Sequence, residues 1–263
     1  MPDLHVAVSG SGPPAYLVHG SMSFGALAFS EQRPLAEEFQ LHVVDRLGFG
    51  RSPEAEGRVD FEAEAGELAA LLEAPAHVLG HSYGAIVCML AAVRRPQRVR
   101  SLAVIEPPAF GLVPDDPSVR RMVSRLDAHI GRSAGMTEEE YLSGFLAAWG
   151  FDFREGPTLN VVARRSVRRS IGERLPTEAE IPLDALAAAP FPILVARGGW
   201  DAVPAAALEI GGRAFIAVCD LLIERLGAEL AVFPGAAHQP QLLGGPFNAR
   251  IAEFWRAADK TRA

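Results

Sequence analysis

The sequence predicts an α/β fold, a mostly parallel and doubly wound sheet with a helical insertion. Short apolar runs typical of buried strands alternate with segments of helical spacing in both halves of the chain. Between residues 107 and 189 this alternation stops, and only helical segments are evident. The length of 263 residues fits one large domain with an insertion as well as two small domains, and the alternation pattern favours the first. We therefore expect a core made of residues 1–106 and 190–263, and an inserted helical domain at 107–189.

The expected strands are apolar runs that end at turn residues, and they lie at 4–8, 15–19, 41–45, 76–79, 101–105, 193–196 and 229–233. Core helices are expected at 61–73, from the turn after 79 to Pro96, at 213–226 and at 247–258. In the insertion, 119–130 and 140–149 have helical spacing, and Thr137 begins a capping-box pattern. Four arginines at 164, 165, 168 and 169 predict a solvated helix face.

Composition excludes some classes of function. The net charge of −7 argues against nucleic acid as a partner. Cys88 and Cys219 lie in apolar, helix-like segments, which favours buried free thiols, and the spacing expected of metal ligands is absent. Neither a signal peptide nor an apolar run of about 18–20 residues is evident, so we expect a cytoplasmic protein that makes no membrane contact. The sequence gives no indication of oligomeric state.

A serine lies at a sharp turn between a predicted strand and a predicted helix, in Gly80-His81-Ser82-Tyr83-Gly84. This is a G-x-S-x-G pattern in the context that a nucleophile elbow requires. The flanking glycines lack a Cβ, which lets strand and helix approach closely. The turn strains the backbone of Ser82 and presents its hydroxyl at the carboxyl end of the strand, where open α/β sheets bind ligands. Ser82 is therefore the candidate nucleophile.

A nucleophilic serine needs a base and an acid that orients the base. His238 follows the last predicted strand on a loop, so the chain order is serine, acid, histidine. Two carboxylates follow neighbouring strands. Asp201 is the first candidate for the acid, and Glu106, which directly follows the strand before, is the alternative. Either carboxylate can reach the histidine from the end of its strand.

The chemistry also needs two N–H donors for the developing oxyanion. The residue after the nucleophile, Tyr83, is expected to supply one from its backbone. The second is expected from the loop after His19-Gly20, by Ser21 or, as the weaker candidate, Met22. The identity of the Ser21 side chain matters less here than its backbone N–H.

Together these segments resemble the α/β-hydrolase superfamily over nearly the whole chain. The similar motifs are His19-Gly20, the loop Asp45–Ser52, the elbow, Gly198-Gly199-Trp200-Asp201 and Gly235-Ala236-Ala237-His238. The resemblance implies that the insertion is a helical cap over the site that sets substrate choice. The segment around Glu106 is similar to zearalenone-lactonase-like members, which use an acid after this earlier strand. Serine rather than aspartate at the elbow argues against epoxide hydrolase and haloalkane dehalogenase activity.

The resemblance and the candidate residues imply a cofactor-independent serine hydrolase. Its expected substrate is a small or medium apolar carboxylic ester or lactone, cleaved through an acyl-enzyme. Carbon–carbon bond hydrolysis by the same residues is the main alternative, and such an enzyme would be expected to place an arginine in its pocket for a substrate carboxylate. A ligand-binding receptor on the same fold is a further alternative.

Overall fold

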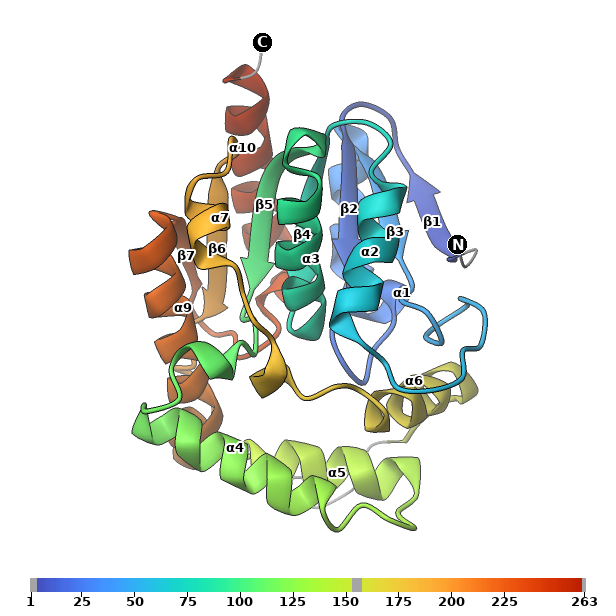
Figure 1. Ribbon diagram of the computed structural model, residues 1–263, viewed down its shortest axis with the longest axis vertical. Coiled ribbons are helices and arrows are strands. Elements are labelled where there is room, and N and C mark those ends of the chain that lie inside the picture. The colour runs from blue at the N-terminus through green and yellow to red at the C-terminus, as the bar shows by residue number, and fades with distance from the viewer. Residues whose placement is uncertain (1–3, 153–157, 262–263) are drawn as a thin grey trace.

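Seven strands form one sheet in the order β1-β3-β2-β4-β5-β6-β7 in the computed structural model, which describes residues 4–152 and 158–261 (Figure 1). β1 pairs antiparallel with β3, and the other neighbouring strands are parallel. Each strand overlaps one of the predicted runs. Their bounds are β1 Val6–Ser9, β2 Pro14–Val18, β3 Gln40–Val44, β4 Ala76–His81, β5 Val99–Ile105, β6 Ile193–Gly198 and β7 Glu229–Phe233.

The strand register brings several strand ends to one edge of the sheet. Val18 of β2 lies opposite Gly80 of β4, and His81 lies opposite Ile105 of β5. Ile105 in turn lies opposite Ala196 of β6. Since these strands are parallel, the residues that follow them meet along a single carboxyl edge, where α/β sheets bind ligands.

Helices cover both faces of the sheet, as a doubly wound fold requires (Figure 1). One face carries α2 (Phe61–Leu71), α3 (Tyr83–Arg94), α7 (Leu183–Ala187) and α9 (Arg213–Leu226), and the other carries α1 (Gly25–Ala28), the 3-10 segment η1 (Ser30–Glu37) and α10 (Gly245–Lys260). A separate cluster of buried apolar side chains fills each face. Shorter turns are η2 (Pro96–Arg98), η3 (Phe110–Leu112), η4 (Pro176–Glu178), α8 (Ala205–Ala207), η5 (Leu208–Gly212) and η6 (Pro240–Leu243).

Three longer helices lie between β5 and β6 in the chain: α4 (Pro117–Ile130), α5 (Glu138–Ala148) and α6 (Val161–Ile171). Figure 1 shows them together at the end of the sheet toward which the parallel strands point. Thr137 caps α5 in the predicted capping box, since its N–H donates to the Glu140 carboxylate at 2.8 Å and its hydroxyl accepts from the Glu140 N–H at 3.2 Å. We call α4, α5, α6, the described residues between them and the segment 172–174 that follows α6 the cap. The next helix, α7, contacts α3 and α9 of the core.

The arginine-rich face of α6 is turned partly toward the core. Arg165 donates to the backbone oxygens of Gly50 and Ser52, at 2.9 and 2.7 Å, and Arg169 donates to that of Gly57 at 2.7 Å. The expectation of a wholly solvated face is therefore wrong for these two side chains. Both use their guanidinium groups to satisfy carbonyl groups of the loop after β3, which ties α6 to the core.

Cys88 in α3 and Cys219 in α9 are both buried and free, as expected from their apolar surroundings. Burial raises the pKa of both thiols, which keeps them protonated. Among the residues that the structure describes, no helix is both long enough and apolar enough to cross a lipid bilayer.

Candidate active site

Ser82 lies at the junction of β4 and α3 in a conformation that side chains rarely adopt, with φ 53° and ψ −126°. A Cβ on Gly84 would lie 2.4 Å from the carbonyl oxygens of Val18 and His19, so only glycine lets α3 pack this closely on β2. The side chain of Ser82 is at the carboxyl edge of the sheet and borders two cavities. The predicted elbow thus has the backbone geometry that exposes a serine hydroxyl.

His238, on the loop after β7, lies against Glu106 at the end of β5. The Nδ1 of His238 is 2.8 Å from Oε2 of Glu106, which is fully buried. The other carboxylate oxygen of Glu106 accepts from the N–H of Gly198 at 2.9 Å and from Nε1 of Trp200 at 2.8 Å. These two donors orient the carboxylate, so that its second oxygen faces the imidazole.

Asp201 is placed elsewhere. Its side chain is exposed, and Oδ1 accepts from the N–H of Gly235 at 2.8 Å. No hydrogen bond within the described ranges joins Asp201 to His238, so the geometry favours Glu106, the alternative acid. The physical reason lies at Trp200, whose buried indole donates to Glu106 while the chain turns the next residue out to solvent. No sequence pattern marked Trp200 for this role.

The imidazole of His238 lies in apolar surroundings, with the rings of Phe215 at 4.3 Å and Trp149 at 4.6 Å between centroids. Burial lowers the pKa of His238 to about 3 and raises that of Glu106 to about 8, because a dry site disfavours both charges. The N–H donors on Glu106 act in the opposite direction, since they favour its carboxylate form. The two groups therefore titrate as a coupled pair.

Nε2 of His238 has no hydrogen-bond partner among the described residues, although His238 and Ser82 line the same cavity. In unliganded sites such contacts often form only when substrate binds. The backbone oxygen of His238 accepts from Nε2 of His81 at 2.9 Å, which anchors the loop after β7.

The loop after β2 passes close to Ser82. A Cβ on Gly20 would lie 2.6 Å from the Cβ of Ser82, so this contact also requires glycine. Met22, which has a φ of 57°, donates its N–H to Oγ of Ser170 at 2.8 Å and is not free to bind an oxyanion. Within the described part of the chain, the N–H groups of Ser21 and Tyr83 have no acceptor. These are the two oxyanion donors predicted from the sequence.

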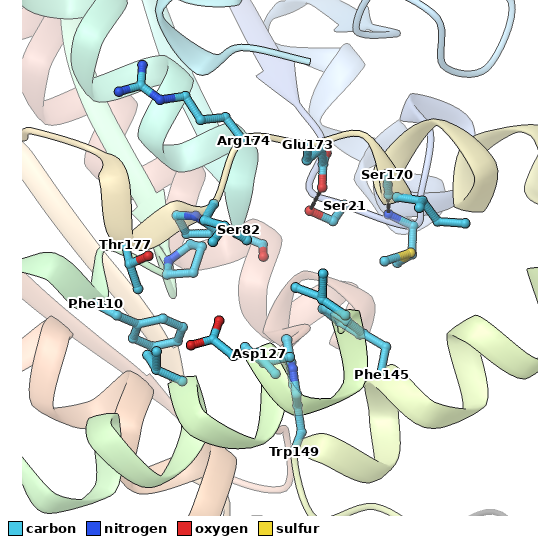
Figure 2. Close-up of a pocket in the computed structure, with 18 of the residues that line it drawn as sticks. Ser21, Ser82, Phe110, Asp127, Phe145, Trp149, Ser170, Glu173, Arg174 and Thr177 are labelled. Atoms are coloured by element: carbon cyan, nitrogen blue, oxygen red, sulfur yellow. Dashed lines mark hydrogen bonds between the residues drawn. The ribbon is translucent and has the colours of Figure 1, made fainter. Parts of the chain in front are cut away.

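Two cavities meet at Ser82, and they share Ser21, Phe145 and Trp149 as walls. The larger, of about 450 Å³, reaches Leu27 and Leu242, and the smaller, of about 90 Å³, lies under α4 (Figure 2). Apolar side chains of α4 and α5 form most of the walls of the smaller cavity, together with residues that follow α6. The arrangement provides space on both sides of a group bound at Ser82.

Charged groups also line the smaller cavity. Figure 2 shows Asp127 of α4 with its carboxylate directed into it, whereas the guanidinium of Arg174 points away from Ser82. Arg174 is paired with Glu178 at 3.1 Å and Asp60 at 3.5 Å. Among the described residues that line the two cavities, Arg174 is the one arginine or lysine. The third charged residue, Glu173, is buried and paired with Arg46. No sequence motif marked Glu173.

Several known proteins are similar to this chain in sequence. The pimeloyl-[acyl-carrier protein] methyl ester esterase of Chromobacterium violaceum is 38% identical over 103 residues, which span 39% of this chain and 40% of that protein. The enzyme of the same name from Xanthomonas axonopodis pv. citri is 32% identical over 186 residues, 70% of this chain and 68% of that one. This chain thus matches about two fifths of the length of the first relative and about two thirds of the second.

Solved structures share the fold over nearly the whole chain. A thermophilic esterase from Thermogutta terrifontis has a TM-score of 0.67 at 22% identity, over 97% of this chain and 93% of that chain. Est816, described as an N-acyl homoserine lactone degrading enzyme, has a TM-score of 0.66 at 21% identity, over 95% and 96% of the two chains. A sequence model of the alpha/beta hydrolase family matches residues 15–254. The chain therefore belongs to the alpha/beta hydrolase family.

Proposed function

We propose that the protein is a serine hydrolase that cleaves a small or medium apolar carboxylic ester or lactone through an acyl-enzyme. The observation that carries the proposal is the contact between His238 and Glu106 at the sheet edge where the elbow presents Ser82. A buried carboxylate that accepts from Nδ1 leaves Nε2 as the basic nitrogen, and this nitrogen borders the cavity shared with Ser82.

In the proposed reaction, Ser82 attacks the substrate carbonyl while His238 accepts the hydroxyl proton. The N–H groups of Ser21 and Tyr83 stabilise the oxyanion, and His238 then protonates the leaving alkoxide. A water molecule, activated by the same imidazole, hydrolyses the acyl-enzyme. Glu106 holds His238 in the Nδ1–H tautomer and stabilises its cation in both steps.

The cavities support an apolar substrate. Leu27, Phe145 and Leu242 border the larger one, and Phe110 and Leu126 border the smaller one. The names of the relatives and of one structural neighbour refer to a methyl ester and to a lactone. Both are carbonyl compounds that the same serine chemistry hydrolyses, and we infer this class for the present chain.

The charges around Ser82 disfavour the carbon–carbon hydrolase alternative, in which the substrate carries a carboxylate. Arg174 is already paired with two carboxylates and lies over the ring of Phe61 at 4.5 Å. Asp127 would repel an anionic substrate. No observation specifically favours the receptor alternative.

The test is labelling and turnover. Wild-type protein should react covalently with an alkyl fluorophosphonate at Ser82 and hydrolyse p-nitrophenyl butyrate, and Ser82→Ala should do neither. Ser30→Ala, which changes an exposed serine that lines neither cavity, should behave as wild type. Equal turnover by wild type and Ser82→Ala would refute the mechanism.

A further inference from the structure

The loop that carries the Ser21 N–H is held in place by the cap. Oγ of Ser21 donates to the carboxylate of Glu173, and the next N–H, of Met22, donates to Oγ of Ser170 at 2.8 Å. Ser170 lies at the end of α6, and Glu173 follows that helix. On the core side, Nδ1 of His19 donates to the oxygen of Gly20 at 2.8 Å. Contacts thus hold the backbone on both sides of the Ser21 N–H.

Glu173 is itself held firmly. The N–H of Val59 donates to the oxygen of Gly172 at 2.9 Å, and the N–H of Arg174 donates to the oxygen of Val59 at 2.8 Å. These two bonds bracket Glu173 and fix its backbone to the loop before α2. Its side chain is only 8% exposed and also binds Nη1 of Arg46 at 3.0 Å. A group with so little freedom can define the position of the residue that it binds.

The charge of Glu173 is balanced locally. Arg46 lies 4.6 Å from the ring centroid of Tyr83, the residue with the other candidate oxyanion donor. A second buried carboxylate, Glu64, lies 3.5 Å from Nε of Arg46. Burial raises the pKa of both Glu64 and Glu173, and the nearby charge of Arg46 opposes this shift in each carboxyl group. This pairing matters because an unbalanced carboxylate next to Ser21 would oppose the formation of an oxyanion.

We propose that Glu173 is a positioning residue that sets the oxyanion hole through the Ser21 hydroxyl, so that the cap completes the catalytic geometry as well as enclosing the substrate. The inference rests on the proposed function, because it assigns the Ser21 N–H to the oxyanion. Glu173 should affect the stability of the transition state more than the binding of substrate. The oxyanion hole binds the tetrahedral oxyanion, whereas substrate affinity comes mainly from the apolar cavities.

Ser21→Ala removes the hydroxyl and keeps the N–H. Glu173→Gln turns an NH2 group, which can only donate, toward the Ser21 hydroxyl, because Arg46 keeps the amide oxygen. With p-nitrophenyl butyrate, each should lower kcat by about tenfold and change KM by less than about threefold, since only the transition-state contact is weakened. The Ki of an alkyl trifluoromethyl ketone, which forms a tetrahedral adduct with serine, should rise by a similar factor. The double variant should be little worse than either single one, because both remove one contact.

Glu64→Gln is the matched control, since Glu64 is a buried partner of the same arginine and does not contact Ser21. It should keep the wild-type kcat. Fluorophosphonate titration of Ser82 supplies the concentration of competent enzyme for every variant. If Glu173→Gln does not fold, the kcat of Ser21→Ala alone tests the inference.

Unchanged kcat in Ser21→Ala, or an equal loss in Glu64→Gln, would overturn the inference. Additive losses in the double variant would overturn it as well. A wild-type protein that neither labels nor turns over would instead refute the proposed function, so the two failures are distinguishable.

Discussion

Replacing Glu106 by glutamine tests which carboxylate orients His238. Oε1 of Glu106 accepts two N–H donors, from Gly198 and Trp200, so the amide oxygen of glutamine will occupy that position. The amide NH2 then faces Nδ1 of His238, to which it can only donate. Nδ1 must become the unprotonated nitrogen, and the proton moves to Nε2. In that tautomer His238 cannot accept the proton of Ser82.

The expected loss follows from this tautomer exchange. An equivalent aspartate-to-asparagine change in a serine protease lowers kcat by roughly 10⁴-fold, which is about 5 kcal/mol at about 1.4 kcal/mol per tenfold. Asp201→Asn should change kcat by less than about threefold, since the amide oxygen can still accept from the Gly235 N–H of an exposed turn.

The assay is initial-rate hydrolysis of p-nitrophenyl butyrate by the two variants and wild type, with thermal unfolding recorded for each. Because glutamine has the size and shape of glutamate, the melting temperature of the Glu106 variant should change far less than its activity. A larger loss of activity in Asp201→Asn than in Glu106→Gln would refute the role of Glu106. Retention of most of the wild-type kcat by both variants would refute it as well.

Three further results are expected. The pair of His238 and Glu106 must lose its shared proton before Nε2 of His238 becomes basic. Because burial raises the pKa of Glu106 to about 8, kcat/KM should rise with pH and reach half its plateau above pH 6.5. A midpoint at or below pH 6.5 would contradict this expectation. Gly84→Ala should lower the free energy of unfolding, measured by urea denaturation, by about 1–3 kcal/mol, because the added Cβ would collide with backbone oxygens at the end of β2. Gly245→Ala is the control and should leave the free energy of unfolding unchanged, because there is open space around Gly245. Asp127→Asn should raise kcat/KM for an ester with a free carboxylate by about two- to fourfold relative to a neutral ester of equal length, because solvent screens this exposed carboxylate. An equal change for both esters would exclude charge as the cause.

The strands of the fold could be predicted because each is an apolar run that ends at turn residues, and each run overlaps an observed strand. The segment η1 was missed, because Ser30–Glu37 is polar, contains Pro34 and lacks a helical apolar period. The arginines of α6 indicated a polar helix face, but not whether that face points to solvent or to the core. That direction depends on carbonyl groups of a loop more than 100 residues earlier in the chain.

Some residues of the candidate site could be predicted from the sequence, and others could not. Ser82 and His238 could be predicted because short local segments and chain order mark them. The choice between Glu106 and Asp201 could not, because each follows a strand at the same edge of the sheet. It depends on whether the chain after β6 turns an indole or a carboxylate inward, and this turn is a tertiary property. Glu173 is beyond prediction for a similar reason, since 152 positions separate it from Ser21.

Met22, Ser82, Glu106 and Trp200 are the four non-glycine residues with positive φ in the described chain, and all four lie around the site. Such conformations cost about 1–3 kcal/mol each, which for four residues approaches the whole net stability of a typical domain. A laboratory screen for heat resistance would therefore be drawn to these positions, where glycine or asparagine relieves the strain. The variants it selected there would tolerate heat better and hydrolyse less, so stabilisation of this enzyme should begin on the far side of the sheet.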